Sequence, residues 1–326
     1  MCANRIVESS DPDEFISLIR PRGCELLVTE RGQFKARSIL IDIGRLFAQR
    51  RCEHLARIVH VDMPRPGIIF LTAPGPSMFW DGAEIGQEDL ALFGSGQEYV
   101  SRLSGPTSWG AISLADDDME AICTSYFGCS SSWISGCTVI TPPPGALARL
   151  RSLHAAAGHL VETSPELLKH PASVRGLEQA LIQAMLESIS MASVRSDSTA
   201  MQHHRIIIRR FSEMLRAHPL EPLHMPATSH AIGVSSRTLR MACQEQYGVS
   251  PTQYLLLRRM RLARRALRQA DPDVTRVTDV ATELGFWELG RFAVKYHQIF
   301  GETPSTTLKM AGLADRRDIP PTYALA

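Results

Sequence analysis

The C-terminal third of the chain contains one short pattern twice, and this repeat restricts the fold more than any other feature. The two copies are AIGVSSRTLRMACQEQYGVSP, residues 231–251, and ELGFWELGRFAVKYHQIFGETPS, residues 283–305. In each copy a glycine precedes a helical pattern, which a second glycine and a proline end. Gly233 matches Gly285 at an offset of 52, whereas Gly248 matches Gly301 at an offset of 53. The second copy therefore has one extra residue, which we place in the turn after its first glycine.

The helical pattern of each copy has large residues at positions i, i+4 and i+8, which lie on one face of a helix. These residues are Leu239, Cys243 and Tyr247 in the first copy and Phe292, Tyr296 and Phe300 in the second. A short segment upstream, PATSHAIG or DVATELG, predicts a preceding helix in each copy. A helix, a short turn that contains glycine and a second helix form a helix-turn-helix unit. The sequence therefore predicts two such units.

Residues 251–270, between the two copies, predict a longer helix with two different faces. Its apolar face has Leu256, Met260, Ala263, Leu267 and Ala270, and the opposite face has Arg258, Arg261, Arg265 and Arg268. About 20 residues span roughly 30 Å at 1.5 Å per residue. Successive major grooves on one face of B-DNA lie ~34 Å apart, so this helix can hold the second helices of the two units in adjacent grooves. We therefore expect Arg258, Arg261 and Arg265 to contact phosphates.

The net charge of +1 conceals an uneven distribution along the chain. Residues 1–204 have 17 basic and 23 acidic side chains, a balance of −6. Residues 205–310 have 16 basic and 9 acidic side chains, a balance of +7. A positively charged C-terminal third indicates contact with a polyanion.

The N-terminal half has a different pattern, that of short strands separated by turn residues. The segments ELLVTE, ARSILIDI, ARIVHVD, GIIFLTA, DLALFG and WGAISL are rich in β-forming residues and predict a sandwich or barrel. After TPPPG the apolar residues recur at helical spacing, and SVRSDSTAMQ has no periodicity. We therefore predict an α+β chain with two domains. The predicted ranges are a barrel at about 20–115 and trailing helices at about 116–191 within a domain at 1–192, a linker at 193–203, an all-α domain at 204–310, and a tail at 311–326.

The repeat and its connecting helix resemble the AraC (arabinose regulator) family of bacterial transcription regulators over about residues 207–308. The motifs that support the resemblance are GVSSRTL, YGVSPTQYLLLRRMRLARRAL and VTDVATELGFWELGRFAVKYHQIFGETPS. The resemblance implies a seven-helix DNA-binding domain with two helix-turn-helix units joined by a linker helix. It also implies an N-terminal effector and dimerisation domain, commonly a cupin-like barrel. The chain departs from the family at Thr228 and Ser229, where leucine and alanine are usual.

The candidate DNA contacts follow from the resemblance and from the helix faces. In the first unit, at about 224–246, they are Ser236, Arg237 and Arg240, and in the second, at about 275–299, they are Gly290, Arg291, Val294 and Lys295. An arginine that binds guanine through two hydrogen bonds is the commonest specific contact, so Arg237 and Arg240 are expected to read bases. Gly290 and Val294 have no side-chain donor, which limits direct readout there to a thymine methyl on Val294. Arg291 and Lys295 are expected to anchor the DNA backbone.

We considered other kinds of site in the N-terminal half. A cupin enzyme would need clustered His and carboxylate ligands, but His54 and His60 are the only histidines before residue 150, with no H-x-H motif. The seven cysteines include no C-x-x-C pair and are read as reduced thiols. We therefore expect no catalytic residue, metal or cofactor. The alternatives are a metal- or thiol-dependent cupin-type enzyme or a redox sensor coupled to DNA binding, and an N-terminal domain that only dimerises.

The expected partners are double-stranded DNA, RNA polymerase and a small-molecule effector that the sequence does not identify. A homodimer is expected through the amphipathic helix at 173–191, for which the sequence shows no partner helix of matching length. No apolar run reaches the ~18–20 residues that span a bilayer, and the N-terminus is polar. We therefore expect a cytoplasmic protein without membrane contact. Activation of transcription is implied by the resemblance alone.

Overall fold

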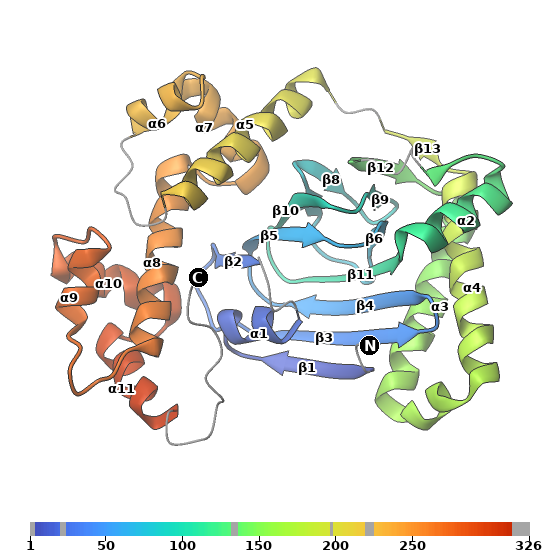
Figure 1. The fold of residues 1–326 in the computed structure, drawn as a ribbon, viewed down its shortest axis with the longest axis horizontal. Helices are drawn as coiled ribbons and strands as arrows, with labels where there is room; N and C mark the ends of the chain where they lie inside the picture. Colours follow the sequence, from blue (N-terminus) through green and yellow to red (C-terminus); the bar gives the residue numbers. More distant parts are fainter. Residues whose placement is uncertain (1–3, 20–23, 132–135, 196–197, 219–224, 315–326) are drawn as a thin grey trace.

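The computed structural model describes residues 4–19, 24–131, 136–195, 198–218 and 225–314. Over these residues, strands dominate the N-terminal part and the C-terminal part is entirely helical from α5 onward (Figure 1). This confirms the predicted fold class, a cupin-like barrel with trailing helices followed by an all-α domain.

The barrel consists of two antiparallel sheets. The larger has the strand order β1 (Arg5–Ser9), β3 (Ala36–Ile43), β4 (Leu46–Glu53), β11 (Thr107–Leu114), β6 (Gly67–Leu71), β9 (Leu90–Phe93), β12 (Cys137–Thr141) and β13 (Ser193–Val194). The smaller has the order β2 (Glu25–Val28), β5 (Arg57–Met63), β10 (Gln97–Leu103), β7 (Met78–Trp80) and β8 (Ala83–Ile85). A short helix, α1 (Pro12–Ile19), follows β1 and contacts both sheets.

The central strands of the larger sheet are covered on both faces, which explains the nearly continuous apolar runs of β6 (GIIFL) and β9 (LALF). In β3, Ile39 and Ile41 pack against the trailing helices, whereas Leu40 packs against the smaller sheet. In β6, Phe70 packs against the trailing helices and Ile69 packs against the smaller sheet. Because successive side chains of a strand point to opposite faces, one run of residues contributes to two cores.

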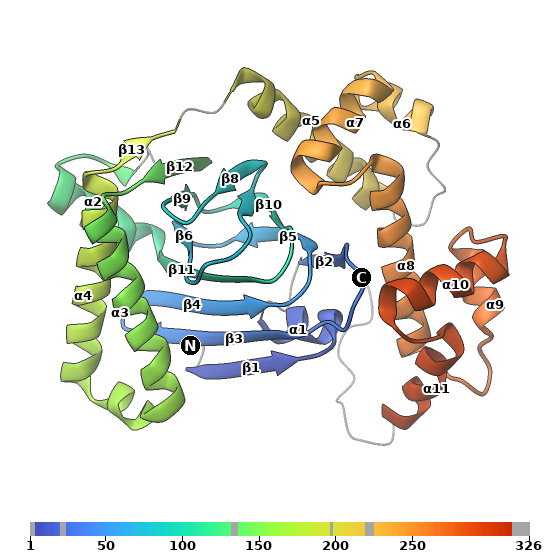
Figure 2. The ribbon, with the colours of Figure 1, turned by 180° about the vertical axis from the view of Figure 1, so that it is seen from behind.

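The trailing helices cover the outer face of the larger sheet (Figure 2). They are α2 (Asp116–Phe127), α3 (Pro144–Thr163) and α4 (Pro171–Ser190), with a 3-10 helix at Pro165–Lys169 between the last two. Strand β12 lies within the stretch that was expected to be helical, and β13 and the start of α5 lie within the predicted linker. The proposed domain limits therefore remain a prediction.

Helix α3 packs along α4, and both have 20 residues. The expectation that the helix at 173–191 has no partner helix of matching length was therefore wrong. The apolar face of α4, with Leu181 and Met185, is buried in the core under the larger sheet. The expected homodimer therefore loses this face as its contact surface and remains a proposal without an assigned surface.

The C-terminal part contains seven helices among the described residues. They are α5 (Thr199–Ala217), α6 (Met225–Ala231), α7 (Ser236–Tyr247), α8 (Pro251–Gln269), α9 (Val277–Glu283), α10 (Leu289–Phe300) and α11 (Pro304–Ala314). Figure 1 shows α6 and α7 near one end of α8 and α9 and α10 near its other end. The expected arrangement of two helix pairs joined by one long helix is therefore present.

The first helix pair shares its core with the barrel. Leu27, Ile58 and Val100 on the outer face of the smaller sheet pack in one cluster with residues of α5, α7 and α8, which include Phe211 and Tyr247. The second helix pair has a separate core around Phe292 and Tyr296, without barrel residues. The two units of the repeat are therefore alike in local structure but differ in their attachment to the N-terminal part.

Candidate nucleic-acid interface

The first helix-turn-helix unit is formed by α6 and α7. Gly233 in the turn has a φ of 76°, a conformation that favours glycine. The hydroxyl of Ser235 caps α7 by accepting a hydrogen bond from the backbone N–H of Thr238 at 3.0 Å. Leu239, Cys243 and Tyr247 are all buried, as the spacing predicted. Helix α6 forms despite its unusual Thr228 and Ser229, although the Thr228 hydroxyl is buried without a hydrogen-bond partner among the described residues.

The second unit is formed by α9 and α10, and the extra residue lies in its turn. Gly285 has a φ of 76°, like its counterpart. Three residues separate Gly285 from the start of α10 at Leu289, whereas two separate Gly233 from the start of α7. Glu288 occupies the N-cap position and makes no side-chain cap. Phe292 and Tyr296 are buried and Phe300 is half-buried, so the predicted inner face is confirmed.

The three candidate contacts of the first unit lie at the N-terminal end of α7. Arg237 and Arg240 are exposed and have no ion pair among the described residues. Ser236 is exposed too, but its hydroxyl lies 2.8 Å from that of Ser229 and ties α7 to α6. The two arginines therefore project donors from one helix face into solvent, whereas the serine has a structural contact.

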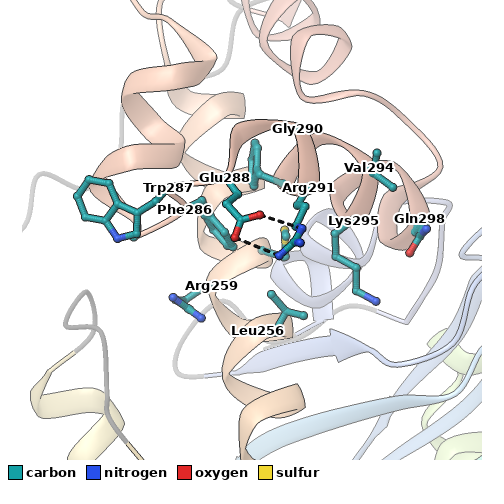
Figure 3. A pocket seen from close by; sticks show the side chains of 13 residues that line it. Leu256, Arg259, Phe286, Trp287, Glu288, Gly290, Arg291, Val294, Lys295 and Gln298 are labelled. Atoms are coloured by element: carbon teal, nitrogen blue, oxygen red, sulfur yellow. Dashed lines mark hydrogen bonds and ion pairs between the residues drawn. The ribbon is translucent and has the colours of Figure 1, made fainter.

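The four candidate contacts of the second unit lie together on α10 (Figure 3). Gly290, Arg291 and Val294 are exposed and Lys295 is half-buried. Arg291 forms an ion pair with Glu288 across the first turn, with Nε 2.8 Å from Oε2. Since both side chains are largely exposed, this pair contributes little to stability and an anion can displace it at small cost.

Two of the three arginines of α8 that were expected to meet phosphates have carboxylate partners within the chain. Arg258 lies 3.6 Å from Glu25, and Arg261 lies 2.7 Å from Asp13. Arg264, which is buried, forms pairs with Asp11 at 2.6 Å and with Glu302 at 3.0 Å. Arg268 also pairs with Asp11, at 2.6 Å, while Arg265 is exposed without an ion pair among the described residues. The phosphate contacts of Arg258 and Arg261 therefore remain a prediction that requires these pairs to open.

The pKa of Asp11 is consistent with its two ion pairs, those with Arg264 and Arg268. Burial alone would raise the pKa of Asp11, but the charges of Arg264 and Arg268 and a backbone N–H donor outweigh it and hold the pKa below its usual range. Part of the charge difference between the two halves of the sequence is thus neutralised inside the chain. We name Asp11, Asp13 and Glu25 the acidic patch.

The turn between β7 and β8 also contacts the helical part. The backbone carbonyl of Asp81 accepts hydrogen bonds from Arg205 of α5 at 2.8 Å and from Gln246 of α7 at 3.0 Å. A side chain on the next residue, Gly82, would bring its Cβ within 2.3 Å of the Gln246 amide. Nearby, the His60 ring lies 3.0 Å from the hydroxyl of Tyr254, at the start of α8. The barrel therefore holds the C-terminal end of α7 and the first turn of α8.

The structure bears on the alternative hypotheses of a metal or thiol site. Among the described residues, no group of three or more His, Cys, Asp and Glu side chains is arranged to hold a metal ion. Burial raises the pKa of the Cys123 thiol to about 11, so this thiol is protonated at neutral pH. Within the same described residues, no helix is long and apolar enough to cross a membrane.

Two exposed apolar residues lie beside the candidate contacts, and one of them, Trp287, was expected from the sequence either to pack or to contact the sugar-phosphate backbone. Met241 is 51% exposed on α7, four residues after Arg237, and Trp287 is 79% exposed in the turn before α10. Single exposed apolar side chains are common on protein surfaces, so their exposure alone does not assign them a binding role. The position of Trp287 directly after Gly285 and Phe286 was visible in the sequence, but its exposure depends on how the longer turn folds.

The comparisons with known proteins concern mainly the C-terminal part. Residues 228–310 match the family described as helix-turn-helix domain. The probable thc operon regulatory protein of Rhodococcus erythropolis is 32% identical over 161 residues, 48% of this chain and 48% of that protein. XylDLEGF operon transcriptional activator 2 of Pseudomonas putida is 36% identical over 77 residues, 24% of this chain and 49% of that protein. The chain thus spans about half the length of these two relatives.

Among solved structures, a probable AraC family transcriptional regulator from Rhodopseudomonas palustris is 34% identical, with a TM-score of 0.29, and covers 32% of this chain and 96% of its own. At that TM-score the superposition adds nothing to the sequence match. The matched family, the named relatives and the two helix-turn-helix units of the structure all indicate the same kind of domain. The C-terminal part of this chain is a helix-turn-helix domain of the AraC type.

Proposed function

We propose that the chain is a sequence-specific regulator of transcription that binds double-stranded DNA through α7 and α10. The observation that carries the proposal is the pairing of two helix-turn-helix units at the ends of one helix, α8, each with an exposed face on its second helix. The 19 residues of α8 span about 28 Å at 1.5 Å per residue. That length suits two successive major grooves on one side of B-DNA.

In this proposal α7 makes most of the base contacts and α10 makes mainly backbone contacts. Arg237 and Arg240 of α7 offer donors to guanine edges, whereas α10 presents Gly290 and Val294, which offer only close approach and a methyl contact. Arg291 and Lys295 then contact the backbone beside α10. Most of the base discrimination is therefore assigned to the first unit.

The N-terminal part is proposed to regulate this binding. The acidic patch holds Arg258 and Arg261 of α8 through carboxylates, so a change in the barrel alters which arginines can reach phosphates. We further propose a small-molecule effector, a homodimer and contact with RNA polymerase, in a cytoplasmic protein without enzymatic activity. We propose that the chain activates transcription. In support, one of the named relatives is a probable operon regulatory protein and the other is an operon transcriptional activator.

Selection of binding sites from randomised duplex DNA by the full chain tests the proposal. The wild type should enrich a defined sequence. Arg237→Ala should cost about 1–3 kcal/mol on that sequence and relax the preference at one or two base pairs. Lys295→Ala should weaken binding to all sequences alike and lower the salt slope by about one unit.

Two results would count against the proposal. A wild-type protein that enriches no sequence would exclude sequence-specific binding. An Arg237→Ala profile identical to that of the wild type would show that this arginine contacts only phosphate and would remove the division of roles.

A further inference from the structure

A hollow of about 600 Å³ lies between α8 and α10, beside the proposed groove-facing surface of the second unit. Its floor is apolar and includes Met260 from α8 and Phe286 and Phe292 from the second unit, all buried. Figure 3 shows Trp287 and Arg259 toward one end of this hollow and Lys295 and Gln298 toward the other. The lining thus combines an apolar floor with cations at the edge.

The arginines of α8 point to two sides of the helix and differ in their partners. Arg258, Arg261 and Arg264 pair with the acidic patch, whereas Arg259 lines the hollow and has no ion pair among the described residues. Its guanidinium lies over the Phe286 ring, 5.3 Å from the centroid. Burial lowers the pKa of Arg259, because no described carboxylate compensates the loss of water.

Lys295 adds a second cation from the other wall. It is half-buried and also has no ion pair among the described residues. Arg291, beside it, already has Glu288 as a partner. Two half-buried cations on different helices therefore face one hollow, and an anion in the hollow would be attracted by both.

Trp287 forms an exposed apolar edge of the same hollow. It is 79% exposed, the largest exposed fraction among the large apolar residues described. A ring in this position offers a flat apolar face with a polar N–H at its edge. The hollow therefore suits a partner in which apolar and anionic groups alternate.

We propose that the hollow receives the sugar–phosphate backbone of the DNA strand that borders the groove entered by α10. Arg259 and Lys295 contact phosphates and Trp287 packs against a deoxyribose. Gly290 and Val294 line the same hollow, so a duplex that meets the groove-facing surface of α10 passes over it. This assignment rests on the proposed function and adds Arg259 and Trp287 to its DNA contacts.

The test measures binding of the full chain to its selected duplex and to a random duplex of equal length, by fluorescence anisotropy at several salt concentrations. Arg259→Ala should weaken binding to both duplexes about fivefold to tenfold and lower the salt slope by about one unit. Arg259→Lys should keep the salt slope of the wild type. Trp287→Ala should weaken binding about fivefold and leave the salt slope unchanged, since it removes no charge. Arg175→Ala, an exposed arginine on α4, is the matched control and should bind like the wild type.

The possible failures are distinguishable. If Arg237→Ala loses affinity while Arg259→Ala and Trp287→Ala both bind like the wild type, the hollow does not hold DNA and the proposed function stands. If the wild type does not prefer the selected duplex, the proposed function fails first.

The fluorescence emission of Trp287 gives a second measurement. It is obtained as the difference between the emission of the wild type and that of Trp287→Phe, and it should change on addition of DNA. A change with decanoate but not with DNA would assign the hollow to an apolar anion and overturn the proposal.

Discussion

Glu53 lies in the barrel with a fully buried carboxylate. Arg57 binds it through two hydrogen bonds, at 2.9 and 3.0 Å, and Trp109 donates a third at 3.0 Å. Burial would raise the pKa of Glu53, but Arg57 outweighs it and the pKa falls to about 2. The pKa is therefore lower in the folded state than in the unfolded chain. The stability that the carboxylate contributes is present above about pH 4.5 and is lost as the pH falls toward 2.

Glu53→Gln should therefore lower the free energy of unfolding by about 3–5 kcal/mol, because it leaves the buried charge of Arg57 without its partner. The midpoint of urea unfolding at pH 7 measures this. Glu8→Gln removes a carboxylate from an exposed pair with Arg37 and should change the stability by no more than about 1 kcal/mol. Equal effects of the two substitutions would contradict the account.

Asp81 has the opposite shift. Burial raises its pKa to about 6, although Arg205, Arg209 and His60 and a hydrogen bond from the Val100 N–H act to lower it. The folded state therefore binds the proton more tightly than the unfolded chain. The resulting stabilisation is present below about pH 3.8 and is lost as the pH rises through about 6.

Asp81→Asn should raise the melting temperature at pH 8 and raise it much less at pH 4.5. Asparagine keeps the acceptor for Val100 and tolerates the φ of 49° at this turn, but it has no charge to desolvate. Thermal unfolding between pH 4.5 and 8 checks the prediction, with the exposed Glu88→Gln as control. A gain of the same size at every pH would show that ionisation is not its cause.

At the scale of single residues, helical spacing predicted which side chains of a helix are buried. Leu239, Cys243 and Tyr247 follow from helical periodicity alone. The burial of Glu53 and Arg57 could not be foreseen, because each charge is tolerated only through the other and through Ser101 on β10, which accepts from Arg57 at 2.9 Å. Such a cluster becomes visible only once the strands are paired.

At the scale of elements, the apolar strands were predictable and the charged ones were not. Strands β3 and β6 are runs of apolar residues, whereas β4 (LFAQRRCE) and β10 (QEYVSRL) contain charges that neighbouring strands neutralise. Helix α8 illustrates the same limit. Its arginine face was predicted from the sequence. Its contact with the acidic patch was not, because it joins residues more than 200 positions apart and no local sequence pattern indicates it.

The contact between α8 and the acidic patch leads to a prediction about affinity. Asp13→Asn should strengthen binding to DNA about threefold to tenfold and steepen the salt dependence, because it removes one of the two carboxylates that pair with Arg261, the other being Glu25. Glu14→Gln is the matched control, since it removes one exposed charge from the same helix without touching α8. Anisotropy with full-length variants measures both. An equal gain in affinity from the two substitutions would show that only the net charge of the chain matters.

At the scale of the whole molecule, the barrel is joined to the first helix-turn-helix unit by a shared apolar core and to α8 by ion pairs. The second unit has its own core and contacts the barrel more loosely, as in the hydrogen bond from Arg31 to Gln298 at 3.3 Å. The repeat in the sequence predicted two equal units, and their unequal attachment could not be read from it. The barrel therefore has more direct contacts with α7 and α8 than with α10.

Hydroxyl-radical footprinting of the full chain on its selected duplex can show whether α7 and α10 enter two successive major grooves. Two protected windows are expected on one face of the duplex, with centres about 10–10.5 base pairs apart. Arg237→Ala should weaken one window more than the other, and Lys295→Ala should do the reverse. A single protected window, or two windows at another spacing, would show that the two helices do not enter successive major grooves.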